Sequence, residues 1–226
     1  NLHLKSGETL GIIGPTGSSK TTLISLIARL YDVSDGEVLV AGHNVKEYDL
    51  KSLRDACAVV LQKNTLFTGT IRSNLLYGNK DATDEQMYEA LKLSEAYEFV
   101  STFKDGLDSP IVEGGNNVSG GQKQRLCIAR ALLKDPKILI LDDSTSACDT
   151  HTDSLIRKNL QLTKPDVTKL IISQRVSSIK DCDQIIVLEK GKIVAIGKND
   201  QLMENCEVYK ELYESQLGGG DFDAQE

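Results

Sequence analysis

The sequence contains no tryptophan and only four prolines, and its apolar runs are short. Runs such as residues 138–141 and 185–188 have the length of a strand and fall far below the ~20 residues of a membrane helix, so no segment is expected to span a bilayer. The residues after Asn1 also lack the charged region and apolar stretch of a signal peptide. Because the chain does not begin with methionine, we expect a fragment, itself soluble, of a longer protein.

Cysteine usage and charge argue against two further classes of protein, disulfide-rich proteins and nucleic-acid-binding proteins. The five cysteines are odd in number, scattered and without a C-x-x-C spacing, which favours free thiols in a reducing cytosol over a disulfide framework. The net charge of −7 comes with no basic stripe, so no nucleic-acid partner is expected. With 40% hydrophobic residues, the chain can bury a core as one large domain or two modest ones.

A glycine-rich loop stands between a short apolar run, residues 9–13, and a segment with apolar residues at helical spacing. In this setting successive backbone N–H groups can wrap phosphates, Lys20 can reach the outer phosphates, and the Thr21 hydroxyl can reach Mg²⁺. A chance glycine–serine turn is the alternative.

Ser19 departs from the pattern, which has glycine before the lysine. If that position needs a left-handed backbone, serine costs roughly 1–3 kcal/mol. This glycine loop comprises Gly14, Pro15, Thr16, Gly17, Ser18, Ser19, Lys20, Thr21 and Thr22.

A second candidate phosphate site opens a long helix. Its first residues are Ser119, Gly120, Gly121 and Gln122. The N–H groups of a first helical turn lack intrahelical partners, and the helix dipole adds positive charge there, so a phosphate is a natural ligand. An ordinary serine-capped helix is the alternative.

Polar residues follow three predicted strands. Gln62 comes after the strand 58–61, and Asp142 and Asp143 end the apolar run 138–141. Carboxyl ends of parallel strands form the ligand-binding edge of an α/β sheet, where a carboxylate can hold Mg²⁺ and an amide can meet a metal-bound water. An exposed glutamine and an acidic turn are the alternatives. A third strand, 169–172, leads to Gln174.

The remaining pattern predicts an α/β fold with a helical insertion. Residues 1–66 and 134–217 form the predicted core, including strands at 36–42, 184–188 and 192–196, the last two as a hairpin, and a closing helix around 202–213. Residues 67–133 are predicted to be helical, with a capping box of Thr83 and Gln86. Residues 218–226 are expected to be a flexible acidic tail.

Together, in this order, the glycine loop, Gln62, Ser119–Gln122, the 138–142 run and Ser146–Asp149 resemble the nucleotide-binding domain of an ATP-binding cassette transporter. The resemblance covers about residues 1–217, and Leu66–Ile71 and the Glu113 loop look most like the exporter branch. It implies a P-loop NTPase core with a mainly parallel sheet and an inserted α-helical subdomain. It also implies ATP and Mg²⁺ as cofactors, ATP hydrolysis that drives transport, and a transmembrane domain fused upstream, at the cytoplasmic side of the cell membrane.

The resemblance assigns roles to individual residues. The glycine loop matches the Walker A motif, Asp142 the Walker B ligand, and Val118–Gln122 the signature motif, while Ser146–Asp149 is similar to the D-loop. Thr21, Gln62 and Asp142 are the implied metal site. In this family two domains pair head to tail, so that Ser119, Gly120, Gly121 and Gln122 would contact ATP held by a second domain. An aromatic residue that stacks on adenine is expected upstream of Asn1.

Three departures from the family pattern fall on the Walker side. Asp143 stands where a glutamate usually polarises the attacking water, and Gln174 stands at the switch histidine; with Gln62 they form the implied catalytic set. Together with Ser19 they resemble the degenerate half of heterodimeric exporters, which binds ATP but hydrolyses it slowly or not at all beside a non-identical partner with a complete site. A fully active homodimer with Asp143 as base, and a soluble cassette protein of DNA repair or translation, are the alternatives.

Overall fold

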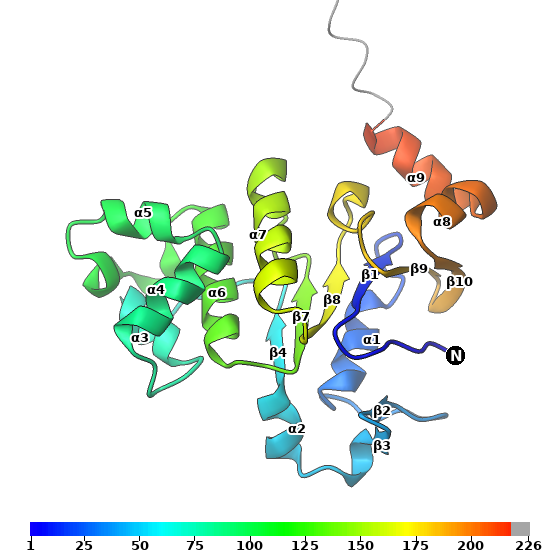
Figure 1. The fold of residues 1–226 in the computed structure, drawn as a ribbon, viewed down its shortest axis with the longest axis horizontal. Helices are drawn as coiled ribbons and strands as arrows, with labels where there is room; N and C mark the ends of the chain where they lie inside the picture. The colour runs from blue at the N-terminus through cyan, green and yellow to red at the C-terminus, as the bar shows by residue number, and fades with distance from the viewer. Residues whose placement is uncertain (218–226) are drawn as a thin grey trace, which may run out of the picture.

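The computed structural model describes residues 1–217, so the predicted acidic tail at 218–226 lies outside the described residues. A six-stranded sheet with the order β10-β9-β1-β8-β7-β4 forms the centre of the fold (Figure 1). Its strands are β1 (Thr9–Ile13), β4 (Cys57–Val60), β7 (Ile138–Asp142), β8 (Thr168–Ile172), β9 (Gln184–Glu189) and β10 (Lys192–Gly197).

The sheet is mainly parallel, as predicted. Strands β9, β1, β8, β7 and β4 run in one direction, and β10 alone is antiparallel, paired with β9. The β9–β10 connection turns at Lys190 and Gly191, both with positive φ, which confirms the predicted hairpin. The predicted α/β fold is therefore confirmed.

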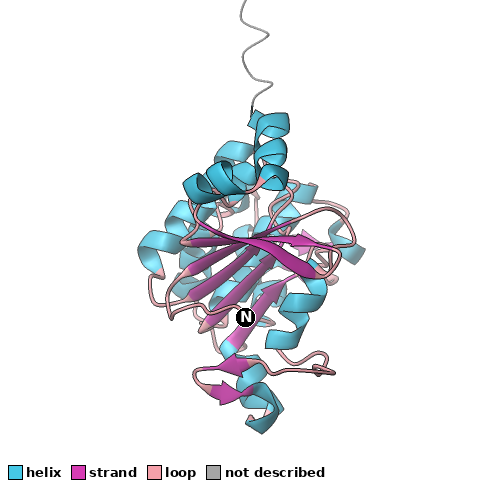
Figure 2. Ribbon diagram, turned by 90° about the vertical axis from the view of Figure 1, so that its right-hand side faces the viewer, coloured by secondary structure: helices cyan, strands magenta, loops and turns pink. Residues whose placement is uncertain are grey.

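Both faces of the sheet are buried, because successive strand residues point to opposite sides. Leu139 and Leu141 of β7 belong to one buried cluster, whereas Ile140 belongs to another. Helix α1 (Lys20–Ile27) covers the Ile140 face through Ile24. Helices α6 (Gly120–Leu133) and α7 (Thr150–Thr163) contribute to the other cluster. Figure 2 shows the strands lying between helices.

The region predicted to be helical lies beside the β4 edge of the sheet (Figure 1). It contains α3 (Ile71–Leu76), α4 (Asp84–Leu93), α5 (Tyr97–Thr102) and α6, with short elements β5 (Gly69–Thr70), β6 (Pro110–Ile111), η2 (Gly106–Asp108) and η3 (Glu113–Gly115). The Thr83 hydroxyl accepts from the Gln86 N–H at 3.3 Å, and the Gln86 side chain accepts from the Thr83 N–H at 2.9 Å, so the predicted capping box is confirmed. Residues of this region share one apolar cluster with the sheet. The limits at 66/67 and 133/134 stay predictions.

Two predicted elements differ from the structure. The strand at 36–42 is reduced to β2 (Leu39–Val40), which pairs with β3 (His43–Asn44) in a separate small ribbon. Leu39 is 52% exposed, so little apolar burial supports a longer strand here. The closing helix is two helices, α8 (Asn199–Asn205) and α9 (Glu207–Leu217), because the chain takes an extended conformation at Cys206. The remaining elements are α2 (Leu50–Ala56), η1 (Val45–Glu47) and η4 (Val176–Ser178).

All five cysteines are buried and free, which confirms the prediction of free thiols. Burial raises the pKa of the thiols of Cys57, Cys127 and Cys148, which lowers the thiolate fraction and so their reactivity. Within residues 1–217, no helix combines the length and apolar character needed to cross a membrane.

The shared core leads to a stability prediction. Ile128 in α6 is fully buried in the cluster that joins the helical region to the sheet. Ile128→Ala is expected to lower the free energy of unfolding by about 2–5 kcal/mol. Leu162→Ala, at a side chain that is 70% exposed on α7, is the control and should change stability by less than about 0.5 kcal/mol. Chemical denaturation followed by circular dichroism measures both. A separate early transition of the helical region in the Ile128 variant would contradict a common core.

Candidate functional site

The sheet topology brings most of the predicted Walker-side residues to one edge. Strands β1, β8, β7 and β4 are neighbours and parallel, so their carboxyl ends lie together. The glycine loop follows β1, Gln174 follows β8, Asp142 and Asp143 lie at the end of β7, and Gln62 follows β4. Four segments that are distant in sequence thus meet at one place.

The glycine loop curls around the Lys20 ammonium group. Lys20 Nζ donates to the carbonyl oxygens of Gly14 and Pro15, at 2.8 and 2.9 Å, and to Ser18 Oγ at 3.2 Å. A Cβ atom at Gly14 would lie 2.0 Å from the carbonyl oxygen of Leu188, so only glycine fits there. The ammonium group is therefore held at the mouth of the loop by neutral oxygens, and its charge is available to an anion.

The start of α1 suits a phosphate. Ser19 occupies the N-cap position but makes no capping hydrogen bond through its side chain. The first N–H groups of α1 therefore have no side-chain acceptor from the cap and point out of the helix end. The backbone of Ser19 is left-handed, with φ 71° and ψ 23°, which explains why glycine is usual at this position.

Thr21 and Asp142 form the candidate magnesium site. Thr21 Oγ1 donates to Asp142 Oδ2 at 2.8 Å, and Asp142 is only 4% exposed. Burial raises the pKa of Asp142, and the charge of Asp143 raises it further, while the Thr21 hydrogen bond and Lys20 oppose the shift. A divalent cation would relieve this buried negative charge, and hydroxyl and carboxylate oxygens are ligands that Mg²⁺ prefers. The residues present therefore fit Mg²⁺.

The protein alone supplies few ligands for this ion. Within residues 1–217 there is no group of three or more His, Cys, Asp or Glu side chains that could hold a metal. Mg²⁺ usually completes its shell with water and substrate phosphates. A site with one carboxylate and one hydroxyl therefore fits a metal that arrives with a nucleotide.

Gln62 contacts Asp143 rather than Asp142. Gln62 Nε2 donates to Asp143 Oδ2 at 3.2 Å, and the backbone of Asp143 has φ 48°. Burial raises the pKa of Asp143, against the opposing effects of Arg175, the Gln174 backbone, Gln62 and Lys20. The amide and the carboxylate predicted to act on water are thus adjacent, and their roles stay predictions.

Gln174 is held in position through a hydrogen bond to its backbone, not through its side chain. Its side chain is exposed, and its carbonyl oxygen accepts from the Gln216 side chain at 2.8 Å. The next residue, Arg175, donates to the carbonyl oxygens of Ser146 and Cys148 at 2.8 and 2.9 Å. The sequence interpretation assigned no role to Arg175. Its position directly after a strand end, beside Gln174, was the available signal.

The signature residues form a separate surface at the start of α6. Ser119 Oγ accepts from the Gln122 N–H at 3.2 Å, and the Gln122 side chain accepts from the Ser119 N–H at 2.9 Å. This pair is an ordinary capping box, the alternative considered above, but it leaves the Ser119 hydroxyl proton free to donate to a phosphate. Among residues 1–217 no hydrogen bond joins Ser119–Gln122 to the glycine loop. One chain therefore does not bring the two predicted phosphate sites together.

Gln124, which the sequence interpretation missed, ties the signature helix to the D-loop. Its Nε2 donates to Ser146 Oγ at 3.1 Å, and its Oε1 accepts from the Ala147 N–H at 2.9 Å. A Cβ atom at Gly121 would lie 2.8 Å from the Ala147 carbonyl oxygen, so close packing is a second reason for glycine in this helix start. Arg175 also donates hydrogen bonds to this loop. The D-loop therefore connects α6 with the segment that contains Gln174.

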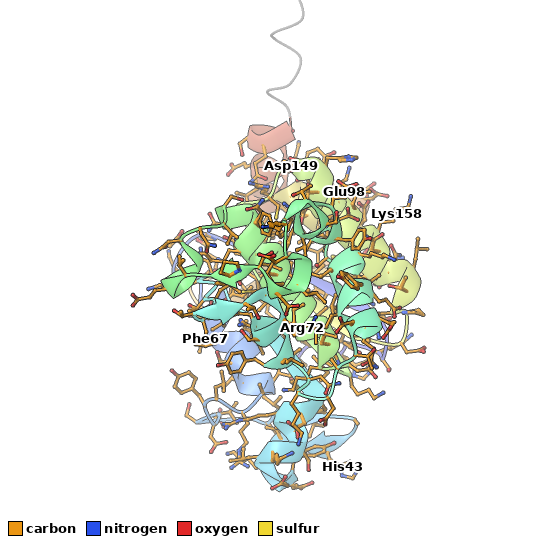
Figure 3. The ribbon with its side chains drawn as sticks, turned by 90° about the vertical axis from the view of Figure 1, so that its left-hand side faces the viewer. His43, Phe67, Arg72, Glu98, Asp149 and Lys158 are labelled. Carbon is orange, nitrogen blue, oxygen red and sulfur yellow. The ribbon has the colours of Figure 1, made fainter. Side chains whose placement is uncertain are left out.

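Two cavities within residues 1–217 are lined by residues other than the Walker-side set. A groove of about 560 Å³ is lined by Leu61, Phe67 and Tyr77 together with the basic residues Arg54, Lys63, Arg130 and Lys134. Phe67 is labelled in Figure 3, on the face that also carries Arg72, which is paired with Asp84 and Asp108.

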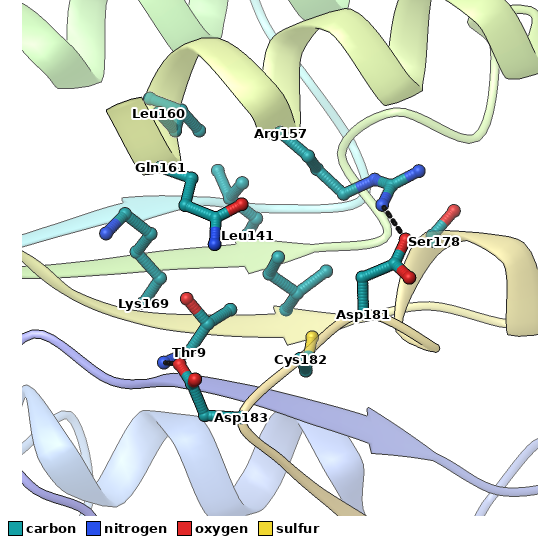
Figure 4. Close-up of a pocket in the computed structure, with 11 residues that line it drawn as sticks. Thr9, Leu141, Arg157, Leu160, Gln161, Lys169, Ser178, Asp181, Cys182 and Asp183 are labelled. Carbon is teal, nitrogen blue, oxygen red and sulfur yellow. Dashed lines mark hydrogen bonds and ion pairs between the residues drawn. The ribbon is translucent and has the colours of Figure 1, made fainter. Parts of the chain in front are cut away.

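The second cavity, of about 40 Å³, lies beside α7 and β8 (Figure 4). Its charged wall residues already have partners: Lys169 Nζ donates to the Lys164 and Val167 carbonyl oxygens at 2.8 Å, and Arg157 pairs with Asp153 and Asp181. Burial raises the pKa of Cys182 in this wall to about 12. This cavity has neither the volume nor the free groups of a ligand site.

The left-handed backbone at Ser19 predicts a stabilising substitution. Ser19→Gly relieves a conformation that costs L-residues about 1–2 kcal/mol, less the entropy that glycine adds to the unfolded chain. We expect the free energy of unfolding to rise by about 0.5–1 kcal/mol, measured by urea denaturation. Ser19→Ala, which removes only the hydroxyl, is the control and should bring no gain; equal effects of both variants would contradict the backbone explanation.

The raised pKa of Asp142 predicts a pH-dependent effect. A carboxyl whose pKa is higher in the folded than in the unfolded state destabilises the fold once it is ionised, so this cost is absent at low pH and appears as the pH rises through the folded pKa. Asp142→Asn should therefore stabilise the nucleotide-free chain at pH 7, and its advantage over the unmodified chain should shrink toward pH 4. Asp55→Asn, at an exposed carboxyl of lowered pKa, is the control and should not stabilise. A constant difference across this pH range would contradict the prediction.

Comparison with known proteins agrees with the site. The family model described as "ABC transporter" matches residues 1–146 of the 226 residues, a range that includes the glycine loop, the signature and Asp142. Proteins named "Putative multidrug export ATP-binding/permease protein" from Staphylococcus aureus strains NCTC 8325 / PS 47 and COL are each 43% identical over 216 residues, which is 96% of this chain and 37% of the relative.

A solved structure shows the same fold. A bacterial Atm1-family ABC exporter, solved with ATP bound, superposes with a TM-score of 0.91 at 34% identity, over 94% of this chain and 37% of that one. The chain thus spans little more than a third of the length of these relatives. Since the family model covers more than half of the chain and includes the glycine loop, Gln62, Asp142 and Asp143, the chain belongs to the ABC transporter family.

Proposed function

We propose that this chain is the ATP-binding domain of an ABC exporter, located at the cytoplasmic side of a membrane, which couples ATP binding and hydrolysis to transport. The relatives are named as export ATP-binding/permease proteins, and the segment shared with this chain is 37% of their length. The remaining length would hold the transmembrane domain. The strand-end edge supplies the nucleotide site that such a domain needs.

In this site we propose a separate role for each group of residues, based on its chemistry. The free N–H groups at the start of α1 and the Lys20 ammonium bind and orient the phosphates. Thr21 and Asp142 would hold Mg²⁺, which would supply Lewis-acid stabilisation of phosphate charge. Asp143 and Gln62, linked at 3.2 Å, are proposed to orient and polarise an attacking water.

The chain's own hydrolysis is proposed to be impaired. Asp143 is one methylene shorter than glutamate, and a displacement of about 1 Å in a catalytic group can cost on the order of 100-fold in rate. Gln174 can donate a hydrogen bond to a phosphate but cannot carry a proton or a positive charge. The observation that carries this proposal is that both substitutions, with the left-handed Ser19, occur at one edge of the sheet.

A second domain is proposed to complete each site. At the start of α6, Ser119 and Gly120 are exposed and Gly121 and Gln122 are half-buried, and within residues 1–217 none of them has a hydrogen bond to the glycine loop. We propose that Ser119, Gly120 and Gly121 bind the phosphates held by a non-identical subunit whose own site has the usual glutamate and histidine. This chain would then act mainly on the nucleotide of its partner.

The alternative of a fully active homodimer is supported by the surroundings of Asp143. The raised pKa of Asp143 and its contact with Gln62 suit a general base, which supports a fully active homodimer. A cassette protein of DNA repair or translation is the less supported alternative, because the compared relatives are named as permeases.

The groove of about 560 Å³ is proposed to receive the transmembrane domain. It combines exposed Phe67 and Tyr77 with four basic side chains, so it offers both apolar area and charge to a partner. It also lies beside Gln62, since Leu61 and Lys63 line it. A segment bound there would sit next to the catalytic residues.

The ATPase rate of the purified chain tests the proposal. We expect Mg-ATP binding with slow turnover, and a rise in kcat of roughly 10- to 100-fold in the double variant Asp143→Glu, Gln174→His. Rates are measured at rising protein concentration until turnover per chain is constant, because the signature acts only across a dimer. Lys20→Ala is the control that should weaken nucleotide binding in both backgrounds.

Other outcomes separate the alternatives. Brisk turnover by the unmodified chain, unchanged in the double variant and abolished by Asp143→Asn, would overturn the impaired site and establish the homodimer. Absence of nucleotide binding to the unmodified chain would contradict the proposed function as a whole.

A further inference from the structure

The last turn of α9 contacts the segment that follows β8. Gln216 Nε2 donates to the Gln174 carbonyl oxygen at 2.8 Å, and Gln216 Oε1 accepts from the Val176 N–H at 2.8 Å. One side-chain amide thus binds two backbone groups that flank Arg175, as a neighbouring strand would. No role was assigned to Gln216 by the sequence interpretation.

The body of α9 is anchored, so the position of Gln216 is defined. Tyr209 is fully buried, and Leu212 and Tyr213 pack against the cluster that contains Val176 and Ile179. Figure 1 shows α9 beside the segment after β8. The Gln216 side chain itself is exposed, so its two hydrogen bonds do not serve to satisfy a buried amide.

The segment held by Gln216 carries contacts to both parts of the candidate site. We define the switch segment as residues 173–176. Within it, the Gln174 backbone faces the Asp143 carboxylate, and the Arg175 guanidinium binds the D-loop carbonyl oxygens of Ser146 and Cys148. Gln216 binds the same few peptide groups from α9, in addition to the contacts that the site itself provides.

We infer that Gln216 is a positioning residue that fixes the backbone of the switch segment and thereby the place of residue 174 at the nucleotide. This inference rests on the proposed function, in which residue 174 meets the γ-phosphate. Two hydrogen bonds to alternate backbone groups restrain both the translation and the rotation of the peptide between them. Residue 174 then depends on the docking of the C-terminal helix as well as on β8.

Amide exchange tests the contact without any reference to activity. In the full chain, Gln216→Leu should speed hydrogen exchange of the Val176 amide, resolved by NMR, by about tenfold, because two neutral hydrogen bonds are lost. Gln216→Glu keeps the acceptor for Val176 but loses the donor to Gln174, and should give a smaller increase. Ser215→Ala, which removes only a hydroxyl bonded within α9 to the Leu212 carbonyl oxygen, should leave the exchange unchanged.

Kinetics test the positioning role. In the Asp143→Glu, Gln174→His background, Gln216→Leu should lower kcat about tenfold and leave KM for Mg-ATP within twofold, whereas a merely structural role would leave both unchanged. Gln216→Glu should recover part of kcat. Ser215→Ala should match the background.

The failures can be told apart. Unchanged exchange at Val176 in Gln216→Leu, or faster exchange with unchanged kcat, would overturn the role of Gln216. If the background neither binds nor hydrolyses ATP in any variant, the proposed function fails, and exchange at Val176 alone then decides whether Gln216 fixes the switch segment. Equal thermal unfolding of all variants is the control for folding.

Discussion

Two adjacent carboxylates face one ammonium group at the end of a buried strand, and the candidate site depends on this balance of charge. Burial raises the pKa of Asp142 and Asp143 and lowers that of Lys20, so desolvation opposes all three charges. The Arg175 guanidinium opposes the shift at Asp143, but its hydrogen bonds go to the carbonyl oxygens of Ser146 and Cys148. Mg²⁺ and phosphates bring charges of both signs to this place, which explains why a site that is costly for the fold is suited to a nucleotide.

The parallel sheet places this charge cluster, and hydrogen bonds connect it to distant parts of the fold. Arg175 reaches the D-loop, Gln124 reaches the same loop from α6, and Gln216 holds the backbone next to Arg175 from α9. The signature helix, the D-loop and the switch segment are thus held together by Gln124, Arg175 and Gln216, which are not among the predicted site residues. This arrangement gives the proposed partner contact a physical connection to the strand-end site.

The sequence predicted the elements that depend on local chemistry. Strand β1, the β9–β10 hairpin and the Thr83 capping box agree with the structure because alternation, turn residues and caps act over a few residues. The strand at 36–42 was overestimated because its alternation resembles a half-buried strand, whereas Leu39 is largely exposed. The contacts of Gln124, Arg175 and Gln216 could not be predicted, since each residue binds groups 22 to 42 positions away in the chain.

By itself, then, the order of motifs determined the family and the mainly parallel α/β core, and it predicted the Walker-side residues, because each motif consists of residue types at short spacing. Only the tertiary structure decided that Ser19 is left-handed, that Gln62 contacts Asp143 instead of Asp142, and that the signature stands apart from the glycine loop of its own chain. These features arise from where parallel strands end and how helices dock on them. A backbone conformation and a contact between distant segments are set by packing, which short-range sequence patterns do not encode.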